Sequence, residues 1–190
     1  AALWLAALVA ALRSVSQTEQ ANPARAWRWA LVSGLSAALA IAVRPNLVPL
    51  AAIVGGYILL GTGRVLRPAL VFAAGTLPGV LGIAALNAYW YGSPLRSGYG
   101  SLSEIFSIGP VGTNLKNYLL WLAVSHSPVI LAAVLYPFHG RRAPDSDCSP
   151  GKRWFLVVFA LANLALYLPY YAFDDWSYIR FLLPSLPVLW

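Results

Sequence analysis

The sequence predicts an all-α fold, a polytopic transmembrane bundle of about six or seven helices that include short and broken ones. Of the 190 residues, 59% are hydrophobic and only 10% are charged, whereas soluble domains carry about 25% charged residues. Mean hydropathy is +0.68. Because apolar runs alternate with short polar links throughout, we expect one transmembrane domain over residues 1–190.

The first half of the chain holds several apolar runs, which predict helices at residues 1–12, 27–43, 47–60 and 69–88. The second and third have 17 and 14 residues, fewer than the roughly 20 that span a bilayer core. Arg44-Pro45-Asn46 interrupts them, so they form either a tight pair of short spans or a re-entrant element. The last run contains Pro78, where we expect a bend because proline lacks the helical N–H.

The second half opens with residues 87–100, NAYWYGSPLRSGYG, which hold three tyrosines, a tryptophan and an arginine. A simple connector needs none of these rings, and aromatic residues gather at the membrane–water interface. We therefore predict an ordered interfacial loop. Further apolar runs predict helices at residues 117–138 and 154–173, with a last helix starting at residue 181.

The distribution of basic residues predicts the topology. Nine of the 13 lysines and arginines fall in the links 13–28, 61–68 and 139–153, which the positive-inside rule assigns to the cytoplasm of a multi-pass inner-membrane protein. This topology accounts for the net charge of +7, so we expect the lipid bilayer and no nucleic acid as a partner. The other four basic residues are Arg44, Arg96, Lys116 and Arg180.

Arg44 and Arg180 lie at predicted helix ends on the less basic, exofacial side, where topology disfavours them. An arginine at that depth either binds a lipid-linked phosphate by paired hydrogen bonds or anchors the helix to headgroups without specific recognition. Pro45 favours the first interpretation for Arg44, because broken helices at membrane depth generally line a cavity. The candidate substrate-binding residues on the same side are Asn87, Arg96, Tyr99, Asp174 and Asp175.

Other chemistries find little support in the sequence. Asp174 and Asp175 could bind a metal, serve as a base, pair with Arg180 or lie in a solvated turn, and no third ligand is spaced to hold a metal. A divalent metal remains possible, but we predict no cofactor. His126 in SHSP is expected to be a structural residue, and the tyrosines of LYLPYYAF form either an aromatic belt or a sugar platform.

Three stretches taken in order carry a family resemblance: AVRPNLVPL, NAYWYGSPLRSGYG and YYAFDDWSYIRFLLPSLPVL. Together they resemble the middle and C-terminal membrane region of GT-C-type integral membrane glycosyltransferases. The closest likeness is to the bacterial protein-mannosyltransferase-like group, which includes the RgtA/B/C/D-like domain. The resemblance covers most of residues 27–190.

The resemblance implies sugar transfer from a polyprenyl-phosphate-linked donor to an acceptor on the exofacial or periplasmic side. Arg44 matches the basic position of the family's helix-pair break, and Arg180 matches the basic position before its Leu-Pro helix. In the loop, residues 87, 92–94 and 98–100 match the family pattern. The family's acidic catalytic motif is absent, so we expect it before Ala1, leave the catalytic base unknown and expect this piece alone to be inactive.

Three alternative functions stay open. A transporter or flippase would also contain broken helices, although no charged residue lies mid-span and no inverted repeat is visible. A polymerase or ligase of polyprenyl-linked glycans would use the same donor class on the same side. A structural membrane subunit would need no cavity behind the loop at residues 87–100. The sequence leaves the sugar, the acceptor and the oligomeric state open.

Overall fold

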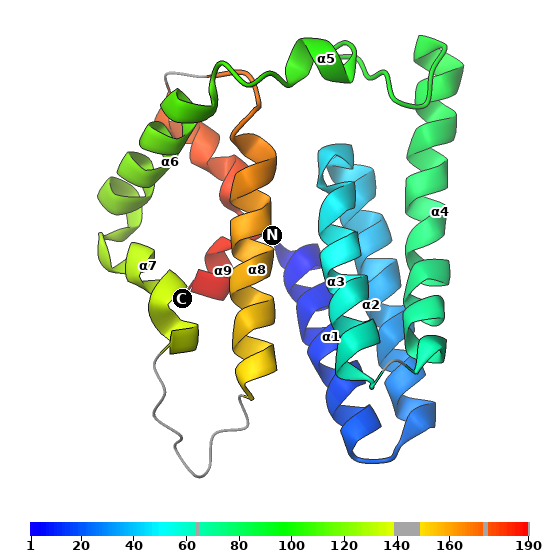
Figure 1. Ribbon diagram of the computed structural model, residues 1–190. Helices are drawn as coiled ribbons and strands as arrows, with labels where there is room; N and C mark the ends of the chain where they lie inside the picture. Colours follow the sequence, from blue (N-terminus) through cyan, green and yellow to red (C-terminus); the bar gives the residue numbers. More distant parts are fainter. Residues whose placement is uncertain (64, 139–148, 173–174, 190) are drawn as a thin grey trace. The chain divides into compact units, whose positions relative to one another are not determined.

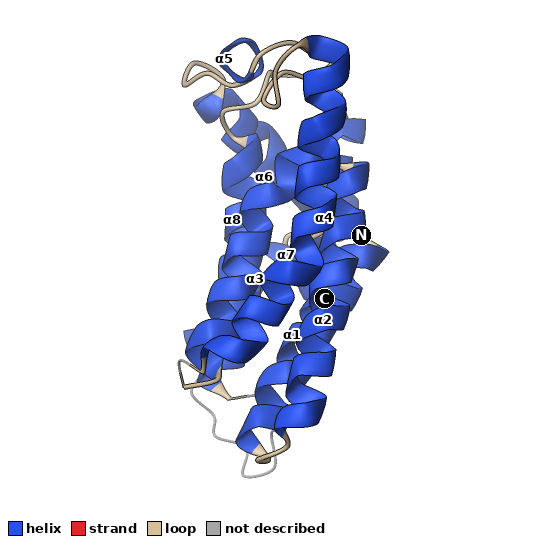
Figure 2. Cartoon of the chain, turned by 90° about the vertical axis from the view of Figure 1, so that its right-hand side faces the viewer, coloured by secondary structure: helices blue, strands red, loops and turns tan. Residues whose placement is uncertain are grey.

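The computed structural model describes residues 1–63, 65–138, 149–172 and 175–189. It is all-helical, with 80% of residues in helix and no strand among the described residues, which confirms the predicted all-α class (Figures 1 and 2). The chain divides into two compact units, Ala2–Leu102 and Ser103–Trp190.

The N-terminal unit is a bundle in which successive helices run in opposite directions (Figure 1). Its elements are α1 (Ala2–Glu19), α2 (Pro23–Val43), the 3-10 turn η1 (Pro45–Leu47), α3 (Val48–Gly61) and α4 (Leu66–Tyr91). The connections are short, so one end of the unit carries the links α1–α2 and α3–α4. The opposite end carries the α2–α3 break and the segment that follows α4. We call these the link end and the loop end.

The predicted polar link at residues 13–28 is wrong, because most of it is helix. Ser14 is fully buried and its hydroxyl donates to the Ala26 carbonyl of α2 at 2.8 Å. This contact lets α1 continue seven residues past its apolar run. The reversal is confined to residues 20–22, where the Asn22 side chain caps α2 by accepting from the Arg25 N–H at 3.2 Å.

Helix α2 lies at the centre of the N-terminal unit because its two contact faces are built from small residues. Toward α1, the Ser33 hydroxyl donates to the Ala7 carbonyl at 2.8 Å, and both residues are fully buried. Toward α4, a Cβ added at Gly34 would overlap the Phe72 carbonyl oxygen. Small residues at such seams let helix backbones approach closely.

The C-terminal unit consists of shorter and more broken elements. They are α6 (Val111–His126), α7 (Val129–Ala132), the 3-10 segment η2 (Ala133–Phe138), α8 (Pro150–Tyr167), the 3-10 segment η3 (Trp176–Leu182) and α9 (Leu186–Leu189). The four-residue helix α5 (Leu102–Ile105) precedes them. The unit's core includes Tyr118, Phe155, Phe159, Asn163 and Tyr167.

Two predicted helices of this unit are wrong. The run at residues 117–138 is not one span, because α6 ends at His126 and Ser127 adopts a φ of +94° before Pro128. The helix expected from residue 181 is a 3-10 segment followed by the four residues of α9. Prolines 184 and 187 remove the backbone donors that a regular helix would need there.

Among the described residues, two helices are long and apolar enough to cross a membrane, α2 with 21 residues and α4 with 26. The apolar helix at Pro45–Gly61 is shorter. Helix α4 continues through Pro78 and ends where Gly92 takes a left-handed φ of +76°. Its outward face presents exposed leucines at helical spacing, among them Leu70, Leu77 and Leu81.

The α2–α4 seam yields a stability prediction. A methyl group added at Gly79 would lie 2.5 Å from the Ala38 carbonyl oxygen and 2.7 Å from its Cα, so Gly79→Ala must push the two helices apart. We expect a loss of about 1–3 kcal/mol, the usual range for overpacking, measured as a lower Tm in detergent. Gly82→Ala is the matched control, because nothing lies within 4 Å of its added methyl. Equal Tm values for the two variants would contradict a close contact between α2 and α4 at Gly79.

Candidate functional site

The predicted break beside Arg44 is confirmed. Helix α2 ends at Val43, and Arg44 is extended with φ −142° and ψ 90° while its N–H donates to the Ala40 carbonyl at 3.0 Å. Pro45 causes the break, since a proline disfavours helical geometry in the residue before it and itself lacks a donor. The Arg44 side chain is half-buried. The break therefore fixes an arginine between two apolar helices.

The break lies below the loop end of α4 rather than level with it. From the α3–α4 link, the 14 residues of α3 and the three of η1 rise about 27 Å, whereas the 26 residues of α4 rise about 39 Å. Figure 1 shows the same offset within this unit. Arg44 is therefore recessed by about 12 Å relative to the end of α4.

The aromatic loop begins later than predicted, because residues 87–91 still belong to α4. Asn87 reaches forward from the helix, and its Nδ2 donates to the Pro94 carbonyl at 3.2 Å. Ser97 and Gly100 exchange backbone hydrogen bonds of 3.1 and 2.9 Å. The Tyr91 hydroxyl packs on Gly98, where an added Cβ would meet it at 2.8 Å. These hydrogen bonds thus hold the loop in a closed conformation, and the Asn87 side chain contributes one of them.

Arg96 and Tyr99 are exposed at the surface of this closed loop. Tyr99 is 84% exposed, as is Tyr89 on the last turns of α4. Hydrogen bonds around Ser93 and Ser97 shape the segment that carries Arg96, whose N–H donates to the Ser93 carbonyl at 3.2 Å. The loop end of the N-terminal unit thus combines two predicted arginines with exposed tyrosines.

In the C-terminal unit, the segment after α8 is held by Asn114. Its Nδ2 lies 3.4, 2.9 and 2.7 Å from the carbonyl oxygens of Tyr167, Leu168 and Tyr170. The last carbonyls of a helix have no following turn to accept from, so a donor from another element stabilises them. Asn114 is buried, with 3% of its surface exposed. One amide from α6 therefore fixes the end of α8 and the turn that leads to η3.

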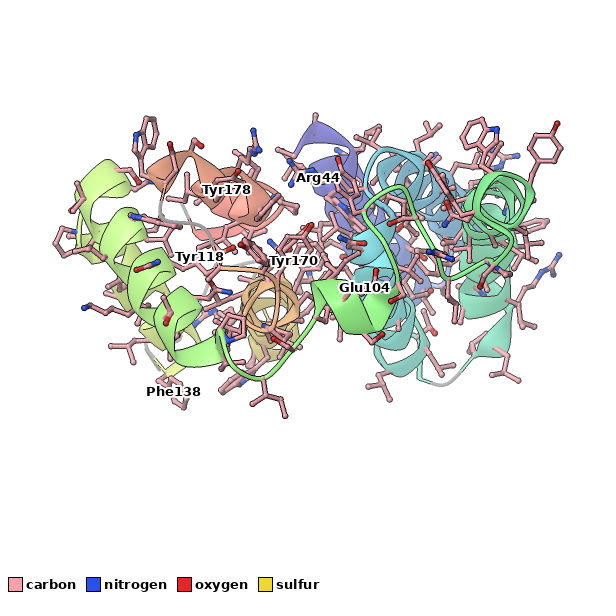
Figure 3. The ribbon with its side chains drawn as sticks, turned by 90° about the horizontal axis from the view of Figure 1, so that it is seen from above. Arg44, Glu104, Tyr118, Phe138, Tyr170 and Tyr178 are labelled. Atoms are coloured by element: carbon pink, nitrogen blue, oxygen red, sulfur yellow. The ribbon has the colours of Figure 1, made fainter. Side chains whose placement is uncertain are left out.

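An aromatic cluster surrounds the segment that carries Arg180. Tyr167 and Phe181 stack with centroids 4.7 Å apart, and Tyr170 meets the edge of Phe181 at 5.5 Å. The Arg180 guanidinium lies 4.9 Å from the centroid of the Tyr178 ring, within the range of a cation–π contact. Figure 3 labels Tyr118, Tyr170 and Tyr178, which come from three different segments of this unit.

The three tyrosines of LYLPYYAF differ in how far they are exposed to solvent. Tyr167 is only 2% exposed and belongs to the core, which is neither the belt nor the platform that the sequence suggested. Tyr171 is 65% exposed, so it alone of these tyrosines has the exposure of a belt residue. Tyr170 is half-buried between the rings of Phe106 and Phe181.

Asp175 has a structural task. Its carboxylate accepts from the Ser177 N–H at 2.7 Å and caps the start of η3. The hydrogen bond from the Ser177 backbone, then that from its side chain, holds the pKa of Asp175 below its ordinary value, and Arg180 lowers it further. Asp174 lies outside the described residues.

The predicted site residues divide between the two units. Arg44, Asn87, Arg96 and Tyr99 belong to Ala2–Leu102, whereas Asp175 and Arg180 belong to Ser103–Trp190. The pairing of Arg44 with Arg180 around one phosphate therefore stays a prediction. Over the part of the chain that the structure describes, no group of three or more His, Cys, Asp or Glu side chains is arranged to hold a metal ion.

Comparison with protein-family models, with curated proteins and with solved structures finds no match to this chain. The glycosyltransferase resemblance therefore stays a prediction from the three sequence motifs.

Sequence reasoning missed the buried amides. Asn114 lies between the predicted loop at residues 87–100 and the helix predicted from residue 117, and Asn163 lies inside the predicted helix at residues 154–173. In the structure Asn163 is fully buried on α8, and its Nδ2 donates to the Ser185 hydroxyl at 2.8 Å. The available signal was an isolated asparagine within or beside an apolar helix, because a buried amide must find partners.

We predict that Asn114→Ala destabilises the C-terminal unit by about 1–3 kcal/mol, because the partly buried carbonyls of Leu168 and Tyr170 lose a donor. The measurement is thermal unfolding in detergent, together with limited proteolysis of the segment after α8. Thr113→Ala, at the exposed neighbouring position, is the control and should leave both readouts unchanged. The predicted role fails if the two variants behave alike.

The cap at Asp175 predicts a pH dependence. Because the folded-state pKa lies below the ordinary value, the cap's contribution to stability is present above the ordinary aspartate pKa and is lost as pH falls through the lowered folded value. A carboxyl-carbon NMR titration should place the midpoint of Asp175 below that of an unstructured aspartate. Ser177→Pro removes the donating N–H and should raise the midpoint. An ordinary midpoint in the unaltered chain would exclude the cap.

Proposed function

We propose that this chain is part of a multi-pass inner-membrane glycosyltransferase that moves a sugar from a polyprenyl-phosphate-linked donor to an acceptor on the exofacial side. Helices α2 and α4 are proposed spans of a polytopic bundle of six to seven helices. Arg44 is the proposed phosphate ligand in the N-terminal unit, and Arg180 is the proposed second one. Residues 13–28, 61–68 and 139–153 are proposed to face the cytoplasm.

The length of α4 between its polar ends supports the membrane placement. Arg67 stands in the first turn, and the exposed rings of Tyr89 and Trp90 stand in the last turns. The 22 residues from position 67 to position 89 rise about 33 Å, close to the roughly 30 Å of a hydrocarbon core. The residues between them are uncharged. Such a helix fits a bilayer with its cationic end on one side and its aromatic end on the other.

The recessed break at Arg44 is the observation that carries the proposed function. A half-buried guanidinium about 12 Å below the end of α4 lies below the level of Tyr89 and Trp90, within the apolar length of that helix, where an ionisable side chain commonly marks a substrate or ion pathway. The extended backbone of Arg44 and the proline that follows form the kind of irregular backbone that membranes tolerate where it is buried in protein or lines a cavity. A polyprenyl-phosphate donor matches both features.

Arg180 has complementary surroundings. Its guanidinium lies 4.9 and 5.8 Å from the ring centroids of Tyr178 and Phe181, which restrict where the side chain can lie. Aromatic faces beside a cation suit a sugar phosphate, because the rings contact the sugar's C–H faces while the cation attracts the phosphate. This combination favours Arg180 as a second donor ligand.

The chemistry that we assign to these residues is electrostatic. In direct displacement at the anomeric carbon, the acceptor oxygen forms the new bond while the bond to the lipid phosphate breaks, so negative charge collects on that phosphate. Fixed cations at the leaving group stabilise this charge as it develops. Proton removal from the acceptor needs a base, and we assign that role to no residue of this chain.

One observation favours a second candidate, a flippase for the same lipid-linked sugar. The run at residues 117–138 is interrupted at Ser127, whose φ is +94°. The Ser125 hydroxyl lies 2.6 Å from His126 Nδ1 just before this break. Discontinuous helices with polar groups at the break are typical of transport sites.

The proposed function is tested by replacing Arg44 in the intact membrane protein, reconstituted in proteoliposomes with a radiolabelled polyprenyl-phosphate sugar. Loss of charge-assisted hydrogen bonds worth about 1.5–3 kcal/mol should lower kcat/KM for transfer about 10- to 100-fold in Arg44→Ala. Arg44→Lys should recover only part of the activity, because lysine lacks the bidentate fork. Arg28→Ala, an exposed arginine near the link end, is the control.

The outcomes separate the two candidates. Unchanged turnover and donor affinity in Arg44→Ala would exclude Arg44 as a phosphate ligand. Movement of labelled donor across the bilayer with no transfer to any acceptor would favour the flippase, and Ser127→Gly would then be the variant to compare.

A further inference from the structure

At the link end of the N-terminal unit, an arginine lies against a tryptophan of α2 at each of the two helix seams. The Arg13 guanidinium of α1 lies 4.7 Å from the centroid of the Trp29 ring. The Arg67 guanidinium of α4 lies 4.1 Å from the centroid of the Trp27 ring. Both distances are typical of cation–π contacts, and tryptophan is the strongest aromatic partner.

The two pairs continue the packing faces of α2. Residues 27, 34 and 38 share one stripe of a helix, and this stripe carries the close contacts to α4 at Gly34 and Ala38. Residues 26, 29 and 33 share the other stripe, where Ala26 and Ser33 bond to α1. Trp29 therefore lies at the link end of the α1–α2 contact face, and Trp27 lies at the link end of the α2–α4 contact face. Each ring is in contact with an arginine of the neighbouring helix.

The charge at this end is strongly one-sided. Among the described residues it includes Arg13, Arg25, Arg28 and Arg67, and the acid closest in sequence to the α1–α2 reversal is Glu19. All four arginines are exposed. The surface of the link end therefore carries several guanidinium groups, two of them on tryptophan rings. It lies where the apolar helices join the polar links α1–α2 and α3–α4.

We propose that the two stacked pairs, Arg13–Trp29 and Arg67–Trp27, form a binding surface for anionic phospholipid headgroups in the leaflet at the link end. The proposal rests on the membrane placement of α2 and α4, but it does not depend on glycosyl transfer. A headgroup phosphate takes paired hydrogen bonds from the edge of a guanidinium whose face is stacked on an indole. The indole contacts the glycerol and upper acyl carbons.

Stacking distinguishes this surface from simple attraction by net charge. An arginine held on a ring loses little side-chain entropy when it binds phosphate, because its planar fork is already oriented. Arg25 and Arg28 carry the same charge at the same end, and within the described part of the chain no ring contact is found for either. The stacked pair and the unstacked pair can therefore be compared at constant net charge.

The experiment titrates the intact protein in neutral detergent with phosphatidylglycerol, using phosphatidylcholine as the matched neutral lipid, and follows Tm. Phosphatidylglycerol should raise the Tm of the unaltered protein and phosphatidylcholine should not. We expect Arg13→Gln/Arg67→Gln to weaken the apparent affinity for phosphatidylglycerol about tenfold, as the loss of two cation–π-oriented contacts implies. Arg25→Gln/Arg28→Gln should weaken it less than threefold.

Two further variants keep the test decisive if the first double variant folds poorly. Arg13→Lys/Arg67→Lys retains the charge and should still lose most of the affinity, whereas Trp27→Phe/Trp29→Phe should lose an intermediate amount. Equal losses in the stacked and unstacked glutamine variants, or equal Tm shifts with both lipids, would overturn the proposal. Failure of the unaltered protein to float with vesicles would instead refute the membrane placement itself, and transferase activity is not a readout in any arm.

Discussion

The close approach of α1 and α4 to α2 is the constraint on which the N-terminal unit depends. Helix α2 can lie between two neighbours because it presents alanine, serine and glycine toward both of them. At these short separations a side-chain hydroxyl on one helix reaches a main-chain carbonyl on the next, as Ser33 does at 2.8 Å and Thr76 does at 3.3 Å. In an apolar bundle such hydrogen bonds satisfy hydroxyl groups that have no water molecule to bond with.

The fixed centre of the bundle sets the positions of the features at both ends. Because α1 and α4 are held along α2, their arginines meet the two tryptophans that follow its start. Because α3 is shorter than α4, the break at Arg44 is recessed while the aromatic loop stands further out. One end is thus cationic with stacked indoles, and the other combines an arginine below the surface with exposed tyrosines.

The sequence predicted the helical class and the break at Arg44 well, since both follow from strong local signals. Composition and apolar periodicity determine the first, and Pro45 determines the second. Element ends were predicted less well. Helix α1 runs past Arg13 because Ser14 bonds to another helix, and hydropathy cannot reveal such a contact. The same holds for Ser127, where the chain leaves α6 inside an apolar run.

For the candidate site, residue types were predictable but partnerships were not. Asn87 was predicted within the loop, but it lies in the last turns of α4 and its amide donates to the Pro94 carbonyl. Asn114 was invisible because its three carbonyl partners lie more than 50 residues away in sequence. Contacts between residues so far apart in sequence depend on the tertiary fold, which no local sequence pattern specifies.

The capping role of Asp175 makes this carboxylate a poor candidate for the catalytic base. A carboxylate that accepts from the Ser177 amide, with its pKa below the ordinary value, is a weaker base than a free aspartate. Moving it to take a proton would also uncap η3, the segment that carries Arg180 and its aromatic neighbours. The hydrogen bond that caps η3 therefore disfavours Asp175 as an acid or a base. For the proposed sugar transfer, the described residues therefore favour stabilisation of a phosphate leaving group by arginine over activation of the acceptor.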